Sequence, residues 1–230
     1  MFSVVFEVHP RKEAFDLYLA LAKGLRPILQ EIDGFIDNER FESLTRPGWI
    51  LSHSTWRDEK AVVRWRTMAK HHETQQRGRD EVFEDYRLRV GEIVSDSAPP
   101  AATSITEQRL DETEVGAAKF LTLTEMQPLS EALNADAVPE LVALDRGHPG
   151  LIGYDLFSSI YNKGKLAFLV AWRDRPAAES FAPTQLSNAY VRHRTVRIVR
   201  DYGMFDRRES PQYYPDIQHP VSAAPGNAIR

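Results

Sequence analysis

The chain has 230 residues, of which 42% are hydrophobic and 27% charged, a composition typical of a globular protein with a substantial core. It contains no cysteine, which excludes disulfides, thiolate metal sites and a cysteine nucleophile. The net charge of −4 and the mixing of basic with acidic residues argue against a nucleic-acid partner. Neither a signal peptide nor an apolar run long enough to span a membrane is visible, so we expect a cytoplasmic protein without a membrane partner.

The first half of the chain predicts the element order β-α-β-β-α-β. Phe2, Val4, Phe6 and Val8 alternate with other residues, which is typical of a strand with one apolar face. Pro27 lies inside the first predicted helix and should kink or restart it. The elements are expected at residues 2–8, 12–32, 35–44, 49–56, 59–69 with 71–85, and 86–94.

A weak internal repeat covers the chain. The Trp-Arg-Asp motif at 56–58 recurs at 172–174, and the same offset of 116 residues places Val4-Val5 on Phe120-Leu121. Beyond this motif the offset falls to 105, which matches Arg89 with Arg194. Since order, spacing and polarity agree in the two halves, we predict a duplication.

The second half predicts the same element order, with a shorter second helix. Its elements are expected at residues 119–124, 130–144, 152–160, 165–172 and 194–201. We therefore divide the chain into a first unit (1–96), a linker (97–116), a second unit (117–205) and an irregular tail (206–230). A four-stranded antiparallel sheet with helices on one face needs a cover for the other, so we expect the two α+β units to pack sheet to sheet.

The stretch LRPILQEIDGFIDNERFESLTRPGWILSHSTWRDEKAVVRWR and its continuation HHETQQRGRDEVFEDYRLRV resemble the antibiotic biosynthesis monooxygenase-like (ABM) family. The resemblance covers about residues 2–96 strongly and 118–203 weakly. It implies two tandem ferredoxin-like units with antiparallel sheets, packed as an intrachain dimeric α+β barrel. The family includes cofactor-free quinone-forming monooxygenases, heme-degrading relatives and members without known activity, so the fold does not settle the function.

His53 lies on the strand predicted at 49–56, on the same face as Leu51 and Thr55. A histidine on an inward strand face could shuttle protons near neutral pH. The alternative is a hydrogen-bonded structural histidine of the barrel. The equivalent residue in the second unit is Leu169, so this histidine is confined to the first.

Trp65 shares a face of the second predicted helix with Val62 and Ala69. In cofactor-free family members a tryptophan in this helix lines the aromatic substrate pocket, so the resemblance implies that Trp65 forms a wall for a flat ligand. Core packing is the alternative, and Phe181 at the equivalent position of the second unit favours it.

The run HHETQQRGR at 71–79 matches the family pattern His-x3-Gln-x2-Gly-Arg from His71 onward. We predict His71 as a catalytic base and Arg79 as an anchor for an anionic oxygen or enolate. Gln75 and Phe83 are predicted as substrate contacts. The alternative is a polar helix surface on which Arg79 pairs with a neighbouring carboxylate.

We expect no metal and no cofactor. The heme-degrading relatives place an iron-ligating histidine about three turns after the helix tryptophan, a position that falls on Gln75 here. The first predicted strand also lacks the asparagine of those enzymes. His71 and His72 are adjacent on a helix and point about 100° apart, so they do not easily share one ion.

These features predict a cofactor-independent monooxygenase that uses O2 on a small aromatic or polyketide-like substrate. His53 or His71 would deprotonate the substrate, while Phe6 and Trp65 enclose its ring. The alternative is a non-catalytic barrel that binds a small apolar ligand or has a structural role, and heme binding or degradation is a third interpretation. We also expect that the pseudo-dimer could form a homo-oligomer.

Overall fold

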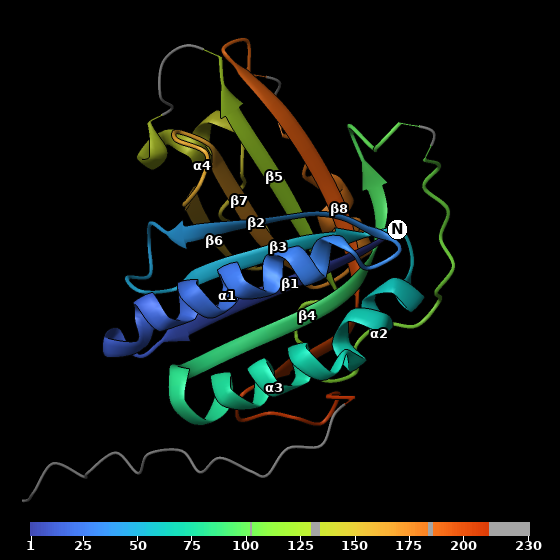
Figure 1. Cartoon of the computed structure of the whole chain (residues 1–230). Helices are drawn as coiled ribbons and strands as arrows, with labels where there is room; N and C mark the ends of the chain where they lie inside the picture. The colour runs from blue at the N-terminus through green and yellow to red at the C-terminus, as the bar shows by residue number, and fades with distance from the viewer. Residues whose placement is uncertain (102, 130–133, 184–185, 212–230) are drawn as a thin grey trace, which may run out of the picture.

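The structure is a computed structural model that describes residues 1–101, 103–129, 134–183 and 186–211. Its strands close into one antiparallel barrel in the order β1-β3-β2-β6-β7-β5-β8-β4 (Figure 1). The strands are β1 (Phe2–Pro10), β2 (Phe35–Ser43), β3 (Ile50–Trp56), β4 (Phe83–Asp96), β5 (Phe120–Pro128), β6 (Leu151–Ser159), β7 (Leu166–Trp172) and β8 (Ala189–Gly203). The helical segments are η1 (Lys12–Ala14), α1 (Phe15–Gln30), α2 (Glu59–Thr67), α3 (Ala69–Arg77), η2 (Gly78–Val82), η3 (Ala135–Ala137), α4 (Val138–Leu141) and α5 (Arg175–Ser180).

The barrel consists of two ferredoxin-like sheets joined at two seams. Strands follow the order β4-β1-β3-β2 in the first unit and β8-β5-β7-β6 in the second. The β4–β8 seam is long and runs from Arg87 opposite Gly203 to Asp96 opposite Arg194. The β2–β6 seam is short, with residues 41–43 of β2 paired to residues 157–159 of β6. The predicted fold, two tandem α+β units forming a barrel within one chain, is confirmed.

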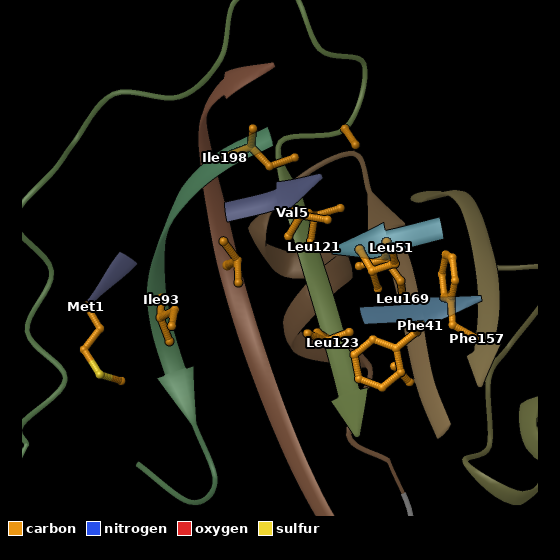
Figure 2. Close-up of a cluster of buried hydrophobic side chains, with 13 residues drawn as sticks. Met1, Val5, Phe41, Leu51, Ile93, Leu121, Leu123, Phe157, Leu169 and Ile198 are labelled. Atoms are coloured by element: carbon orange, nitrogen blue, oxygen red, sulfur yellow. The ribbon is translucent and has the colours of Figure 1, made fainter. Parts of the chain in front are cut away.

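The apolar core of the barrel draws side chains from both units. Since alternate residues of a strand point to opposite sides of a sheet, Val5 and Leu51 face inward while their neighbours face outward. They meet Leu121, Leu123 and Phe157 of the second unit, all at most 1% exposed (Figure 2). Each unit thus covers the inner apolar face of the other, as the sequence predicts.

Helices cover the outward face of the first unit's sheet (Figure 1). α2 begins where the Asp58 carboxylate accepts a hydrogen bond from the Ala61 amide at 2.8 Å, which satisfies one of the free donors at a helix start. Gly34, which precedes β2, has a φ of +91°, a conformation that glycine adopts without steric cost. Gly34 allows the turn between α1 and β2, and the Asp58 cap fixes the residue at which α2 begins.

Three expectations about local structure are wrong. α1 continues through Pro27 to Gln30 without a restart, although the proline cannot donate a hydrogen bond to the carbonyl one turn earlier. The helical stretch expected over 71–85 ends at Val82: α3 stops at Arg77, a π turn continues it over Gly78–Val82, and β4 begins at Phe83. Of the helix expected over 130–144, positions 130–133 lie outside the described residues, and η3 with α4 occupies only 135–141.

Strand pairing also corrects the alignment of the two repeats at their first strands. Phe2 lies opposite Trp56 and Phe120 lies opposite Trp172, so Phe2 corresponds to Phe120. Val4-Val5 therefore matches Thr122-Leu123 rather than Phe120-Leu121. The boundaries proposed above for units, linker and tail stay predictions, and positions 212–230 lie outside the described residues. Among the described residues, no helix is both long and apolar enough to cross a membrane.

Candidate active site

A cavity of about 140 Å³ lies between the first unit's sheet and its helices. The sheet contributes Val4, Phe6, Ser52, Ser54, Leu88 and Val90. The helices contribute mainly apolar side chains, among them Ala22, Leu25, Leu29, Val62, Val63 and Trp65. A smaller cavity of about 50 Å³ adjoins it and shares Phe6, Gln75, Leu88 and Tyr202. The candidate site is therefore on the helix side of the sheet and not between the two sheets.

His71 is held against Trp65 at the wall of the larger cavity. Its Nδ1 lies 2.9 Å from the Trp65 carbonyl oxygen, and the two rings stack with centroids 4.0 Å apart. A carbonyl oxygen only accepts hydrogen bonds, so Nδ1 carries the proton and Nε2 keeps its lone pair. Burial lowers the pKa of His71 to about 4, which keeps the imidazole neutral at pH 7. This arrangement can accept a proton from a bound molecule.

Six of the seven predicted site residues line the two adjoining cavities. Phe6 and Gln75 border both of them. Trp65 and His71 line the larger cavity, and Arg79 and Phe83 line the smaller one. Segments from β1, α2, α3, η2 and β4 are thus brought together, as a single candidate site requires.

His53, in contrast, lies inside the barrel and borders neither cavity. Its Nε2 is 2.8 Å from the Ser3 hydroxyl, and the residue is only 2% exposed. Burial, reinforced by the charges of Arg194, Arg192 and Lys165, lowers the pKa of His53 well below 6.5. The outward residues of β3 face the larger cavity instead.

Arg79 is buried at the far end of the smaller cavity. Its Nη1 donates a hydrogen bond to the Tyr86 hydroxyl at 2.7 Å, and Arg207 donates to the same oxygen at 2.6 Å. Two guanidinium groups therefore converge on one phenol oxygen beside Phe83. Such a group of donors can stabilise negative charge on a bound molecule.

Sequence reasoning missed several residues of the larger cavity. Tyr18 on α1 and Asn38 and Arg40 on β2 line it, and the second unit contributes Arg200 and Tyr202 from β8. Comparison of the two repeats could have revealed the β2 pair, because the 116-residue offset places Tyr154 and Leu156 at these positions in β6. The β8 residues left no comparable signal, since only the closed barrel brings β8 beside β4.

Comparisons with known proteins agree with this architecture. The profile described as antibiotic biosynthesis monooxygenase matches residues 1–77. A protein of Pyricularia oryzae (strain 70-15), named jasmonate monooxygenase ABM, is 42% identical over 220 residues, which cover 94% of this chain and 99% of the relative. The chain belongs to the antibiotic biosynthesis monooxygenase (ABM) family. Because the similarity to this ABM protein extends over almost the whole chain, it includes the second unit as well as the first.

Solved structures share the ABM chain's fold at low sequence identity. A crystal structure of aldoxime dehydratase aligns with a TM-score of 0.53 and 12% identity, over 86% of this chain and 80% of that one. The aldoxime dehydratase OxdRE in complex with butyraldoxime aligns with a TM-score of 0.53 and 9% identity, over 86% and 78% of the two chains. At these identities the likeness concerns the barrel alone.

The helix side of the second unit of this ABM chain is occupied by side chains. Phe181, which corresponds to Trp65, packs against Trp172 with ring centroids 5.7 Å apart. Val138, Leu156 and Phe168 belong to the same buried cluster. At positions of β6 and β7 where the first unit has polar residues lining its cavity, the second unit has apolar residues that pack together.

Proposed function

We propose that the chain is a monooxygenase whose substrate binds in the cavity beside Trp65 and His71. Family membership and the relative named jasmonate monooxygenase ABM support an oxygenase reaction. The observation that supports this cavity as the reaction site is the His71 hydrogen bond to the Trp65 carbonyl, which leaves Nε2 as a base at an apolar wall. The substrate is a small, largely apolar molecule with a C–H bond activated by a neighbouring carbonyl.

His71 starts the reaction by removing a proton from this carbon. An imidazole whose pKa is about 4 is a weak base in isolation. However, the imidazolium and the enolate form together in one step, so each becomes the counter-ion of the other in a site of low polarity. Trp65 and Phe6 hold the ring of the substrate, and Gln75 lies where it can orient the enolate oxygen.

The oxygen step needs only the enolate and O2. The carbanion gives one electron to O2, and the resulting radical and superoxide combine into a peroxide anion. This anion takes back the proton and then loses water, which leaves a carbonyl at the reacting carbon. One oxygen atom enters the product and the other leaves as water, so the reaction of an activated CH2 group balances without a bound cofactor.

Two substrate types fit these requirements. An anthrone has a flat ring system and an acidic CH2 group, which agrees with the aromatic or polyketide-like substrate expected from sequence. Jasmonic acid, the compound in the relative's name, is a cyclopentanone with C–H bonds next to its carbonyl and an apolar side chain. Both have apolar bodies that match the aliphatic and aromatic walls of the cavity.

The test is to incubate the purified chain with anthrone or with jasmonic acid in 18O2, following O2 uptake and product mass. We expect one 18O atom per product molecule, and a loss of turnover of about 10²-fold or more in His71→Ala. His72→Ala, on the exposed side of α3, is the matched control and should keep turnover.

Two outcomes point elsewhere. Thermal stabilisation by these ligands without O2 uptake would support the non-catalytic binding module instead. A Soret shift on hemin titration, with turnover only in the loaded protein, would contradict the cofactor-free reaction and favour the heme interpretation. Equal turnover in wild type and His71→Ala would remove His71 as the base.

A further inference from the structure

The larger cavity is strongly cationic although the chain as a whole is acidic. Its lining contains four arginines, Arg26, Arg40, Arg66 and Arg200, and a single carboxylate, Glu59. That carboxylate already pairs with Arg109, at 2.6 Å from its Nη1. An apolar cavity with excess positive charge attracts and retains an anionic molecule.

Arg40 differs from the exposed Arg26 in that part of its guanidinium group is shielded from solvent. Its Nη1 donates to the Asn38 side-chain oxygen at 3.2 Å, and its guanidinium hydrogen bonds with the Tyr18 hydroxyl. Its Nε is shut off from solvent and has no hydrogen-bond partner among the residues that the structure describes. Within the same residues, none of the ion pairs includes Arg40.

Three other buried arginines of this chain have carboxylate partners. Arg89 pairs with Glu7, Arg194 pairs with Glu125, and Arg197 pairs with Glu92 at 2.9 Å. A shielded guanidinium without a carboxylate is costly, because the charge loses its hydration and gains little in return. The arrangement around Arg40 is therefore the one expected of a site that a ligand completes.

We propose that Arg40 is the anion subsite of the cavity and binds a carboxylate of the substrate. This inference rests on the proposed function, since it names the substrate class of the same cavity: monocarboxylic acids with an apolar body. A carboxylate can take two guanidinium N–H groups side by side, and the edge that carries the unpartnered Nε is the one that Asn38 does not contact. Tyr18 and Asn38 act as positioning residues that fix the plane of the guanidinium.

The second repeat is consistent with this assignment. Leu156 stands at the position of Arg40 and is 5% exposed within an apolar cluster, and Tyr154 stands at the position of Asn38. The charge and the open cavity therefore occur together in the first unit, whereas apolar side chains take the equivalent positions in the second.

The experiment measures binding by calorimetry for two acid and methyl ester pairs: jasmonic acid with methyl jasmonate, and anthraquinone-2-carboxylic acid with its ester. We expect wild type to bind each acid at least about tenfold more tightly than its ester, because only the acid supplies the counter-ion. Arg40→Met should remove this preference and leave ester affinity within about twofold. Arg77→Met, at an exposed arginine of α3 that borders neither cavity, is the matched control and should keep the preference.

The comparison of acid with ester in wild type needs no variant, so a folding defect in Arg40→Met cannot obscure the result. Equal affinity for both members of each pair, or a preference that persists in folded Arg40→Met, would overturn the anion subsite. Turnover of the esters in either case would leave the proposed monooxygenase function standing. Binding of both acids without any O2 uptake would uphold the subsite and contradict that function.

Discussion

At the scale of single residues, His53 and His71 differ in their surroundings. His71 lines the larger cavity with its Nδ1 against the Trp65 carbonyl oxygen, whereas the Nε2 of His53 lies 2.8 Å from the Ser3 hydroxyl inside the barrel. Both are neutral at pH 7, because burial disfavours the charged form of each. Burial therefore lowers the pKa of both residues, but only His71 lies beside the larger cavity.

The pH dependence of turnover should report His71. Its pKa of about 4 means that the base stays available through the mildly acidic range and is lost only as pH falls through about 4. We expect the acid limb of kcat/KM near pH 4 instead of about 6.5, the usual range of histidine. O2 uptake measured between pH 3.5 and 8, with circular dichroism to confirm folding, checks this. A limb near pH 6.5 would assign the base to another group.

His53 should instead make the fold sensitive to acid. As pH falls below about 6.5 the unfolded chain binds a proton at this residue while the folded chain does not, so stability declines, by at most about 1.4 kcal/mol per pH unit. His53→Gln removes this contribution, and urea unfolding at pH 7 and pH 5 should show a smaller loss of stability than in wild type. His72→Gln is the matched control. An unchanged loss in His53→Gln would show that His53 titrates alike in both states.

At the scale of elements, α2 and α5 are related by the repeat but differ in what they support. Both begin with an aspartate that accepts a hydrogen bond from an alanine amide: Asp58 from Ala61 and Asp174 from Ala177, at 2.8 and 2.9 Å. α2 carries Trp65 toward a cavity, whereas α5 ends at Phe181 in a packed cluster.

The two caps therefore make a matched pair of mutations. Asp58→Ala and Asp174→Ala should each reduce the free energy of unfolding by about 1 kcal/mol, since each leaves a helix N-terminus without its acceptor. Only Asp58→Ala should also weaken ligand binding, because fraying of α2 displaces Trp65. Urea denaturation and calorimetry measure the two effects separately. Equal ligand affinity in both variants would contradict a role for α2 in the site.

Strand prediction succeeded where alternation was regular, as in Phe2–Pro10, because one side of each strand is apolar along its whole length. Helix prediction was weaker in the second unit. Leu141, Val142 and Leu144 have helical spacing, but α4 ends at Leu141 and Ala143 adopts a φ of +57°. Apolar spacing identifies buried residues there, and tertiary packing decides their backbone conformation.

At the scale of the whole molecule, the repeat symmetry is kept inside the barrel and lost outside it. The ion pair between Arg87 and Asp201, at 2.5 Å, has its repeat image in Arg192 and Asp96, at 2.7 Å. Outside, Ser52 and Ser54 line the cavity of the first unit, and their counterparts in β7 are apolar. The two units thus share an ion pair inside the barrel, and they differ in the residues on the helix side of each sheet.

This asymmetry predicts one ligand site per chain. Phe168, Phe181 and Val138 occupy the space that corresponds to the cavity of the first unit. Calorimetric titration with a carboxylic acid ligand should therefore saturate at one molecule per chain, and native mass spectrometry should show a single adduct. Two equivalent sites would contradict the packing of the second unit.

Apart from Phe6 on β1, the residues of the candidate site that could be predicted are local in sequence. Trp65, His71 and Gln75 fall within one helical stretch whose pattern resembles the family. Arg40 was missed because its environment is assembled from distant parts: Tyr18 on α1 and a cavity wall that includes Arg200 of β8. The sequence of one protein does not show which distant residues come into contact when the barrel closes.

The short β2–β6 seam also involves the backbone of Arg40. Its carbonyl oxygen accepts the Ile160 amide at 3.0 Å, next to the three paired residues at 41–43 that fasten this side of the barrel. A strand pairing this short opens more readily than the long β4–β8 pairing, so we expect local opening of the barrel to start at the β2–β6 seam. A ligand that immobilises the Arg40 side chain should also restrict its backbone. Deuterium uptake at the Ile160 amide should then slow when the cavity of the first unit is occupied, so exchange at this seam would report ligand binding.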